Sequence, residues 1–121
     1  GKNIAPAPLE AKLKHHPMIS QVVIIGDKRK YLSALITLNP GLTPDKARSD
    51  ISAHIEKLNE VLPSYETIKR FSILERDFTV ESGELTPTMK AKRSFIQEKY
   101  KTVIESLYQG DSKGFENQLS I

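Results

Sequence analysis

The sequence predicts an α+β domain, with a small three-stranded mixed or antiparallel sheet packed with about three helices. Two runs rich in β-branched and aliphatic residues lie close together in the first third of the chain, and a segment with apolar residues every three or four positions follows them. The expected order is helix, strand, strand, helix, strand, loop, helix. Packing the helices on a single sheet is the simplest arrangement for that order.

Length and composition point to one compact core. The chain has 121 residues, of which 38% are hydrophobic, which fits a single domain. It contains no cysteine, so disulfides and cysteine-based zinc sites are excluded. No apolar run approaches the roughly 20 residues that span a bilayer, and no secretory signal is visible at the start. The chain begins with glycine rather than methionine, which suggests a piece of a longer protein.

The first third of the chain predicts a helix and a hairpin. A short helix from about Pro8 to His15 is ended by Pro17. Strands are expected over 19–27 and 31–38, because both segments are rich in β-branched and other apolar residues. Since only a short polar turn joins them, they should pair as an antiparallel hairpin.

The middle of the chain predicts a helix and a third strand. Thr43 and Pro44 supply an N-cap followed by proline at the first helical position, and Pro63 ends the helix. The strand is expected over 68–74. Steps of 4, 4, 3 and 4 place five apolar residues on one helical face: Ala47, Ile51, Ile55, Leu58 and Leu62.

The last third predicts a long loop and a final helix. The loop covers 75–88, and the helix runs from about Lys90 to Tyr108, with Gly110 as its C-terminal stop. The domain should therefore cover residues 1–110. Residues 111–121 are polar and are expected to form a flexible C-terminal tail.

The most distinctive segment is the cationic loop at 84–93. Pro87 stiffens it, and Lys90, Lys92 and Arg93 place three cations within four residues, next to an expected helix start. Such a run is often only a solvated surface. However, cations oppose the helix dipole at an N-terminus, and a cluster that breaks a local rule often has a function. The loop is therefore a candidate anion-binding site, with Lys90 as the candidate catalytic residue.

Other candidate sites are weaker. His15 and His16 are adjacent and cannot chelate from one helical face, and His54 is expected at the surface or half-buried, so no metal site is predicted. The turn at 27–30 is basic and could contact a phosphate, although a simple polar turn explains it better than a catalytic role does. No P-loop, GxGxxG motif or Ser/His/Asp set is present.

The charge leaves the function class open. The net charge of +3 and the pI near 9.1 permit an anionic ligand. A non-catalytic module that binds nucleic acid or another polyanion is the main alternative, although the paired aromatic platforms of single-strand binders are missing. A protein-interaction domain is the third possibility.

Three separated motifs resemble one family. Residues 1–10 (GKNIAPAPLE), 23–36 (VIIGDKRKYLSALI) and 85–93 (LTPTMKAKR) resemble, in order, the small C-terminal domain of adenylate-forming enzymes. Among these enzymes they are most similar to the long-chain fatty acid–CoA ligases (acyl-CoA synthetases). The resemblance covers about residues 1–108, which is nearly the whole chain.

The resemblance implies a fragment of an enzyme. Such ligases join ATP and a fatty acid into an acyl-adenylate and then transfer the acyl group to CoA. It implies a large N-terminal adenylation domain of the same polypeptide that binds ATP, Mg²⁺ and the acid, and a small domain that rotates between the half-reactions. Lys90 then corresponds to the lysine of adenylation. Gly1, Lys2 and Asn3 would line the CoA channel, and Arg29 or Lys30 would meet a CoA phosphate.

Further expectations follow from the resemblance. Many relatives have glycine where this chain has Met89. The isolated domain should bear no cofactor and be inactive, and nucleic acid is not an expected partner. The parent is expected in the cytoplasm, with peripheral membrane association left open. Acyl chain length belongs to the missing acid pocket.

Overall fold

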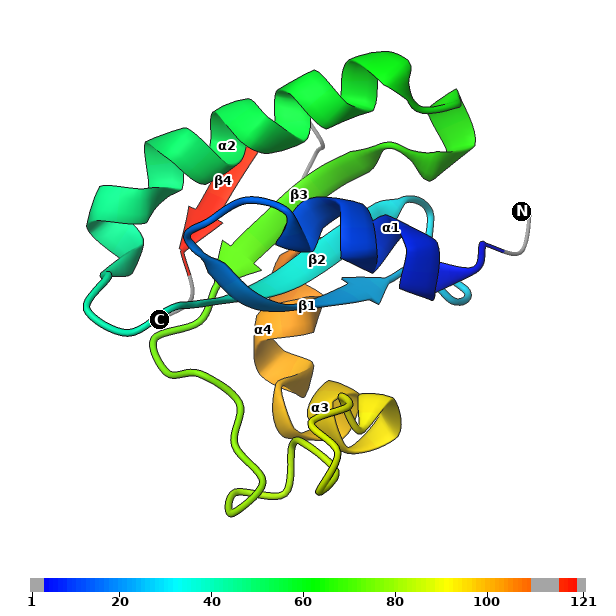
Figure 1. Cartoon of the computed structure of the whole chain (residues 1–121). Coiled ribbons are helices and arrows are strands. Elements are labelled where there is room, and N and C mark those ends of the chain that lie inside the picture. The colour runs from blue at the N-terminus through cyan, green and yellow to red at the C-terminus, as the bar shows by residue number, and fades with distance from the viewer. Residues whose placement is uncertain (1–3, 110–115, 120–121) are drawn as a thin grey trace.

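The computed structural model describes residues 4–109 and 116–119, and its centre is a mixed sheet with strand order β1-β2-β3-β4 (Figure 1). β1 pairs antiparallel with β2, whereas β2 with β3 and β3 with β4 are parallel. The strands are β1 (Ile19–Ile25), β2 (Leu32–Leu38), β3 (Ile68–Ile73) and β4 (Glu116–Leu119). The α+β class and the mixed sheet of three predicted strands are confirmed, and the short β4 extends that sheet.

The predicted hairpin of β1 and β2 forms one half of the sheet, with β1 at its edge. Every residue of β2 is buried, which is what a strand covered on both faces requires. Alternate residues point to opposite faces of the sheet. Ile24 and Ala34 therefore belong to one apolar cluster, and Val23 and Leu35 to the other.

One face of the sheet is covered by α1 (Pro6–Lys14) and α2 (Pro44–Val61) (Figure 1). The predicted signals at α2 are found, since Thr43 occupies the N-cap position and Pro44 the first helical position. The predicted apolar faces pack on the sheet through Leu9, Leu13, Ala47, Ile51 and Ile55. A short 3₁₀ helix, η1 (Ser64–Glu66), connects α2 to β3.

The other face is covered by the loop after β3 and by two short helices, α3 (Arg93–Lys99) and α4 (Lys101–Ser106). The sequence predicts one helix from about Lys90 to Tyr108, and this is wrong in two respects. The helix begins three residues later, and it breaks at Tyr100, where φ is −103° and ψ is 26°. The core on this face contains Phe78, Leu85, Ile96, Ile104 and Leu107.

The end of the chain is described only in part. Residues 110–115, which include the expected helix stop Gly110, lie outside the described residues, as do 120–121. The domain boundary at 110 and the flexible tail of 111–121 therefore stay predictions, although residues 116–119 of that tail pair with β3. Among the described helices, none has the length and apolar character needed to span a bilayer.

Candidate functional site

The cationic loop forms a short hairpin on the α3 side of the sheet. Leu85 and Ala91 make an isolated antiparallel bridge. One residue further out on each side, the backbone N–H of Lys92 donates to the carbonyl oxygen of Glu84 at 2.8 Å. These contacts close the base of the segment 84–92, which is called the lysine hairpin below. Because the base of the hairpin is closed, its tip projects from the domain in a fixed direction.

Thr86 organises the tip of the lysine hairpin. Its backbone N–H donates to the carbonyl oxygen of Lys90 at 2.8 Å, and its carbonyl oxygen accepts the N–H of Met89 at 2.7 Å. The backbone N–H of Lys90 donates to Thr86 Oγ1 at 3.1 Å. These hydrogen bonds make Lys90 part of the hairpin turn. Lys90 therefore lies before α3 and is not in its first turn.

The side chain of Lys90 is available to a ligand. The residue is exposed, and within the described part of the chain its ammonium makes no hydrogen bond or ion pair. Met89, which precedes it, has φ of 70°. This is the left-handed region that glycine adopts at lowest cost. Glycine at this position, which the resemblance leads us to expect in relatives, would therefore fit the backbone found here.

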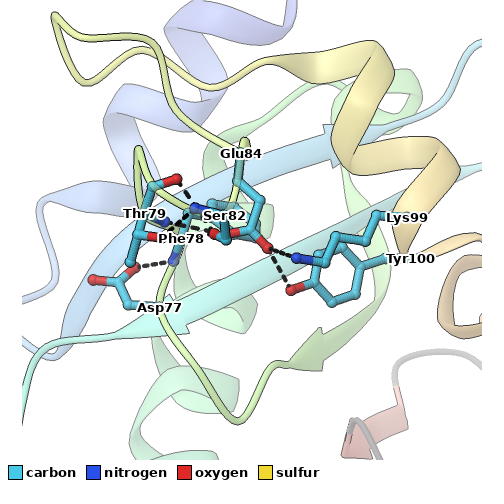
Figure 2. A network of polar contacts seen from close by, with 7 residues as sticks. All are labelled: Asp77, Phe78, Thr79, Ser82, Glu84, Lys99 and Tyr100. Atoms are coloured by element: carbon cyan, nitrogen blue, oxygen red, sulfur yellow. Dashed lines mark hydrogen bonds and ion pairs between the residues drawn. The ribbon is translucent and has the colours of Figure 1, made fainter.

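A buried carboxylate, that of Glu84, supports the base of the lysine hairpin (Figure 2). Its Oε1 accepts hydrogen bonds from the backbone N–H of Thr79 at 3.1 Å and from Ser82 Oγ at 2.6 Å. Its Oε2 accepts hydrogen bonds from Lys99 Nζ and from the Tyr100 hydroxyl, both at 2.8 Å. The carboxylate thus joins the preceding turn to the break between α3 and α4.

The network sets the protonation of its members. Burial raises the pKa of Glu84, but the hydrogen bonds from Lys99, Ser82, Tyr100 and Thr79 together outweigh it, so the pKa is lowered from its ordinary value of 4.5. Burial, and then the hydrogen bond to Glu84, raise the pKa of Tyr100 to about 12. At neutral pH the site therefore holds a carboxylate and a neutral phenol.

A second carboxylate, Glu10 of α1, holds Arg93, the residue that directly follows the lysine hairpin. Arg93 Nη1 and Nη2 donate to its Oε2 and Oε1 at 2.6 and 3.0 Å, a bidentate pair. The backbone N–H of Ile24 donates to the same Oε2 at 2.8 Å. The hydrogen bond from Arg93 to Glu10 raises the pKa of Arg93 above its ordinary value. The first and third sequence motifs are therefore in direct contact.

The basic turn between β1 and β2 differs from the lysine hairpin. Arg29 makes a bidentate ion pair with Glu105, at 3.2 and 2.6 Å, and its guanidinium lies 4.7 Å from the centre of the Tyr108 ring. The hydrogen bond that Arg29 donates to Glu105 raises the pKa of Arg29. Lys28 and Lys30 are exposed, so they are better placed than Arg29 to meet an incoming anion.

A cavity of about 670 Å³ lies beside this turn. It is bounded by the start of the described chain, the β1–β2 turn, η1, the start of β3 and the start of α3. Its cationic lining combines five residues: Lys28, Arg29, Lys30, Lys69 and Arg93. Lys90 is not part of this lining, so the structure separates two cationic regions.

The predicted site residues thus fall into three groups. Lys90 stands on the hairpin, whereas Arg29 and Lys30 line the cavity. Gly1, Lys2 and Asn3 lie outside the described residues. The sequence analysis missed Glu84 and Glu10, which hold the hairpin, and it missed Lys69 of the cavity. Glu84 and Glu10 are both in the recognised motifs or next to them, but only the fold shows what they contact.

The histidines and acidic residues supply no metal site in the described part of the chain. The rings of His16 and His54 meet edge to face at 4.9 Å, but no group of three or more metal-binding side chains forms among the described residues.

This chain belongs to the AMP-binding enzyme C-terminal domain family, whose model matches residues 1–112. The class is thus the small domain of adenylate-forming enzymes, as the three motifs predict. The chain is 39% identical over 129 residues to the long-chain-fatty-acid–CoA ligase FadD15 of Mycobacterium tuberculosis. It is 35% identical over 148 residues to the human long-chain-fatty-acid–CoA ligase ACSBG1.

The alignments cover most of this chain but little of the relatives. They include 89% and 90% of this chain, but 21% and 20% of the two ligases. The chain therefore spans about a fifth of the length of the curated relatives it matches. Its homologues are larger polypeptides of which this domain is one part.

Solved structures of adenylate-forming enzymes share the fold. The adenylation domain of a carboxylate reductase from Mycobacterium chelonae is similar with a TM-score of 0.77 and 30% identity, over 89% of this chain and 18% of that one. The A-PCP didomain of the carboxylic acid reductase from Segniliparus rugosus, in complex with AMP, has a TM-score of 0.74 and 28% identity. That match covers 87% of this chain and 16% of the reductase chain.

Proposed function

We propose that this chain is the mobile C-terminal domain of an ATP-dependent, AMP-forming long-chain fatty acid–CoA ligase, and that Lys90 acts in acyl-adenylate formation. The observation that carries the role of Lys90 is its exposed ammonium, unpaired within the described part of the chain, on a hairpin with a closed base. Nearby cations with a structural role are paired, as Arg93 and Lys99 are.

The chemistry needs what this side chain offers. In adenylation, a carboxylate oxygen of the fatty acid attacks the α-phosphorus of ATP. The new O–P bond forms while the bond between the α-phosphorus and the bridging oxygen breaks, and pyrophosphate leaves. Two anions must approach each other, so an ammonium that contacts both offsets the repulsion as charge develops. The adenylation domain of the same polypeptide, outside this chain, would bind ATP and the acid, with Mg²⁺ neutralising phosphate charge when bound.

The second half-reaction would use the other cationic region. The thiolate of CoA attacks the acyl carbon, the acyl–oxygen bond to AMP breaks, and AMP leaves. The cavity beside the β1–β2 turn offers the exposed cations Lys30 and Lys69 to the CoA phosphates, with Gly1, Lys2 and Asn3 following as channel lining. Arg29 contributes less, because Glu105 already neutralises it.

The test of Lys90 uses the parent ligase and separates the half-reactions. Lys90→Ala should slow acyl-adenylate formation by about 10²–10³-fold, the usual cost of removing one group that stabilises charge. Thioester formation from supplied acyl-adenylate should be spared. The matched control is Lys57→Ala, which removes an exposed lysine of α2. Equal losses in both half-reactions, or a loss in the control, would contradict the proposal.

The CoA site has its own test. Lys30→Ala combined with Lys69→Ala should raise the KM for CoA and leave acyl-adenylate formation unchanged.

If nucleic acid, rather than CoA, binds the wild-type chain in a way that weakens steeply with salt, the polyanion-binding alternative gains instead. The isolated chain should form no acyl-adenylate from ATP and fatty acid, and turnover by this chain alone would contradict its assignment as one domain of the ligase.

A further inference from the structure

Glu84 is the most deeply buried acidic side chain in the described part of the molecule, with an exposed fraction of 2%. A buried carboxylate carries a large desolvation cost, which is acceptable when the charge is fully paired. Here four donors meet its two oxygens: Thr79, Ser82, Lys99 and Tyr100 (Figure 2). The lone pairs of the carboxylate are therefore close to fully used.

The two oxygens connect different parts of the fold. Oε1 contacts only the preceding turn, through Thr79 and Ser82. Oε2 contacts only the break between α3 and α4, through Lys99 and Tyr100. The Tyr100 ring also lies 6.0 Å from that of the buried Phe78. Oε2 therefore ties Glu84 to helices whose inner faces pack on the sheet.

The backbone of the same residue begins the lysine hairpin. The carbonyl oxygen of Glu84 accepts the N–H of Lys92, and the Leu85–Ala91 bridge follows directly. The orientation of the hairpin relative to the core is thus set where the carboxylate is held. A buried charge is a weak source of net stability, since apolar packing of similar volume often does as well. Apolar packing in place of Glu84, however, would not fix the direction of the hairpin, because it offers no directional hydrogen bonds.

We infer that Glu84 is a positioning residue for Lys90: through Oε2 it fixes the direction in which the lysine hairpin projects from the domain. This inference rests on the proposed function of Lys90 and deepens it. Misplacement of a reacting group by about 1 Å can cost roughly 10²-fold in rate. Loosening the hairpin should therefore impair the half-reaction that uses Lys90 more than it impairs folding.

One variant should break the contacts of Oε2 and leave those of Oε1 in place. In Glu84→Gln the amide oxygen can keep the Thr79 and Ser82 contacts, while the NH₂ group replaces the acceptor that faces Lys99. In the parent ligase we expect acyl-adenylate formation to slow by about 10–100-fold, with the KM values for ATP and fatty acid unchanged. Thioester formation from supplied acyl-adenylate should remain at the wild-type rate. Glu81→Gln, an exposed neighbour in the same turn, is the matched control and should change none of these.

Two further variants remove the donors to Oε2 and leave Glu84 itself unchanged. Lys99→Met and Tyr100→Phe each remove one Oε2 donor and leave Glu84 in place, so they serve if Glu84→Gln does not fold. Each should slow adenylation selectively. Hydrogen exchange of the Lys92 amide, which donates to Glu84, gives a readout independent of activity, and exchange should accelerate in all three variants.

The outcomes separate this inference from the proposed function. If Lys90→Ala leaves adenylation intact, the proposed role of Lys90 fails, whatever Glu84 does. If Lys90→Ala slows adenylation but Glu84→Gln, Lys99→Met and Tyr100→Phe lower only the unfolding temperature, Glu84 is merely structural and the inference is wrong. Selective loss of adenylation with faster Lys92 exchange supports it.

Discussion

The lysine hairpin and the β1–β2 turn are both cationic loops with a non-glycine residue at positive φ, Met89 at 70° and Lys28 at 60°. They differ in where the charge is neutralised. In the β1–β2 turn a central cation, Arg29, is paired with Glu105 and packed on Tyr108. In the hairpin the ion pairs lie at the base and beyond the end, whereas Lys90 at the tip has no partner in the described part of the chain. A run of basic residues therefore divides into cations that build the loop and cations left for a ligand.

The largest stability effect should come from the paired end of the hairpin. Glu10→Ala removes both acceptors of Arg93 and leaves the N–H of Ile24 without its partner, so we expect a loss of about 1–3 kcal/mol in the free energy of unfolding. Lys90→Ala should change it by less than about 0.5 kcal/mol. Denaturant unfolding of the chain measures both. Equal losses would remove the distinction between paired and unpaired cations.

Acid should distinguish the buried carboxylate of Glu84 from the more exposed carboxylate of Glu105. The folded-state pKa of Glu84 is lowered, so its contribution to stability is present at neutral pH and is lost as the pH falls below its ordinary value of 4.5. The pKa of Glu105 is also lowered, chiefly by Arg29, but this group is far more exposed. Glu84→Gln should therefore flatten the decline in stability between pH 5 and pH 3, taken as about the window of carboxylate titration, more than Glu105→Gln does. Thermal unfolding across this range makes the comparison, and equal flattening would contradict it.

Breaking the ion pair of the β1–β2 turn should have a smaller effect that depends on salt. Arg29→Ala removes an ion pair with an exposed partner and a ring contact, so its destabilisation should be less than that of Glu10→Ala and should shrink as salt is added. Unfolding at low and high salt measures both features. A loss that is insensitive to salt would assign the effect to the packing of Arg29 on Tyr108 instead.

The smallest effect should come from the positive-φ residues. Met89→Gly and Lys28→Gly each replace a strained residue with one suited to that backbone. We expect each change to be neutral or stabilising by up to about 1 kcal/mol. If Met89→Gly also leaves the rate of adenylation unchanged, the methionine side chain has no part in placing Lys90. A destabilising change at either position would indicate that the side chain makes a contribution larger than the backbone strain.

The sequence predicted those parts of the fold that depend on neighbours in the chain. Apolar runs identify β1, β2 and β3, and the Thr43-Pro44 start and the periodic face identify α2. The break at Tyr100 was not predictable in this way, because the apolar period continues through it. At this break the Tyr100 side chain contacts Glu84 and Phe78, which come from the preceding loop.

The same reasoning explains what the sequence revealed about the site. Lys90 is recognisable because a stiff, basic loop is unusual and because it lies in a recognised motif. Glu10 is not recognisable as part of that site, since 83 residues separate it from Arg93. Pairing across such a distance depends on how the fold places α1 and α3 on either side of β1, whose Ile24 N–H also donates to Glu10. The residues that offer chemistry were therefore visible in the sequence, and the residues that hold them in place were not.

The contact between Glu10 and Arg93 has a consequence for timing in the proposed enzyme. It joins α1 to Arg93, the residue that directly follows the lysine hairpin. If the domain turns as a unit, as the proposed function requires, withdrawal of the lysine hairpin would carry α1 along with it. On the proposed function, the departure of Lys90 and the arrival of the groups that meet CoA would then be a single event, and the two steps would keep their order without a separate signal.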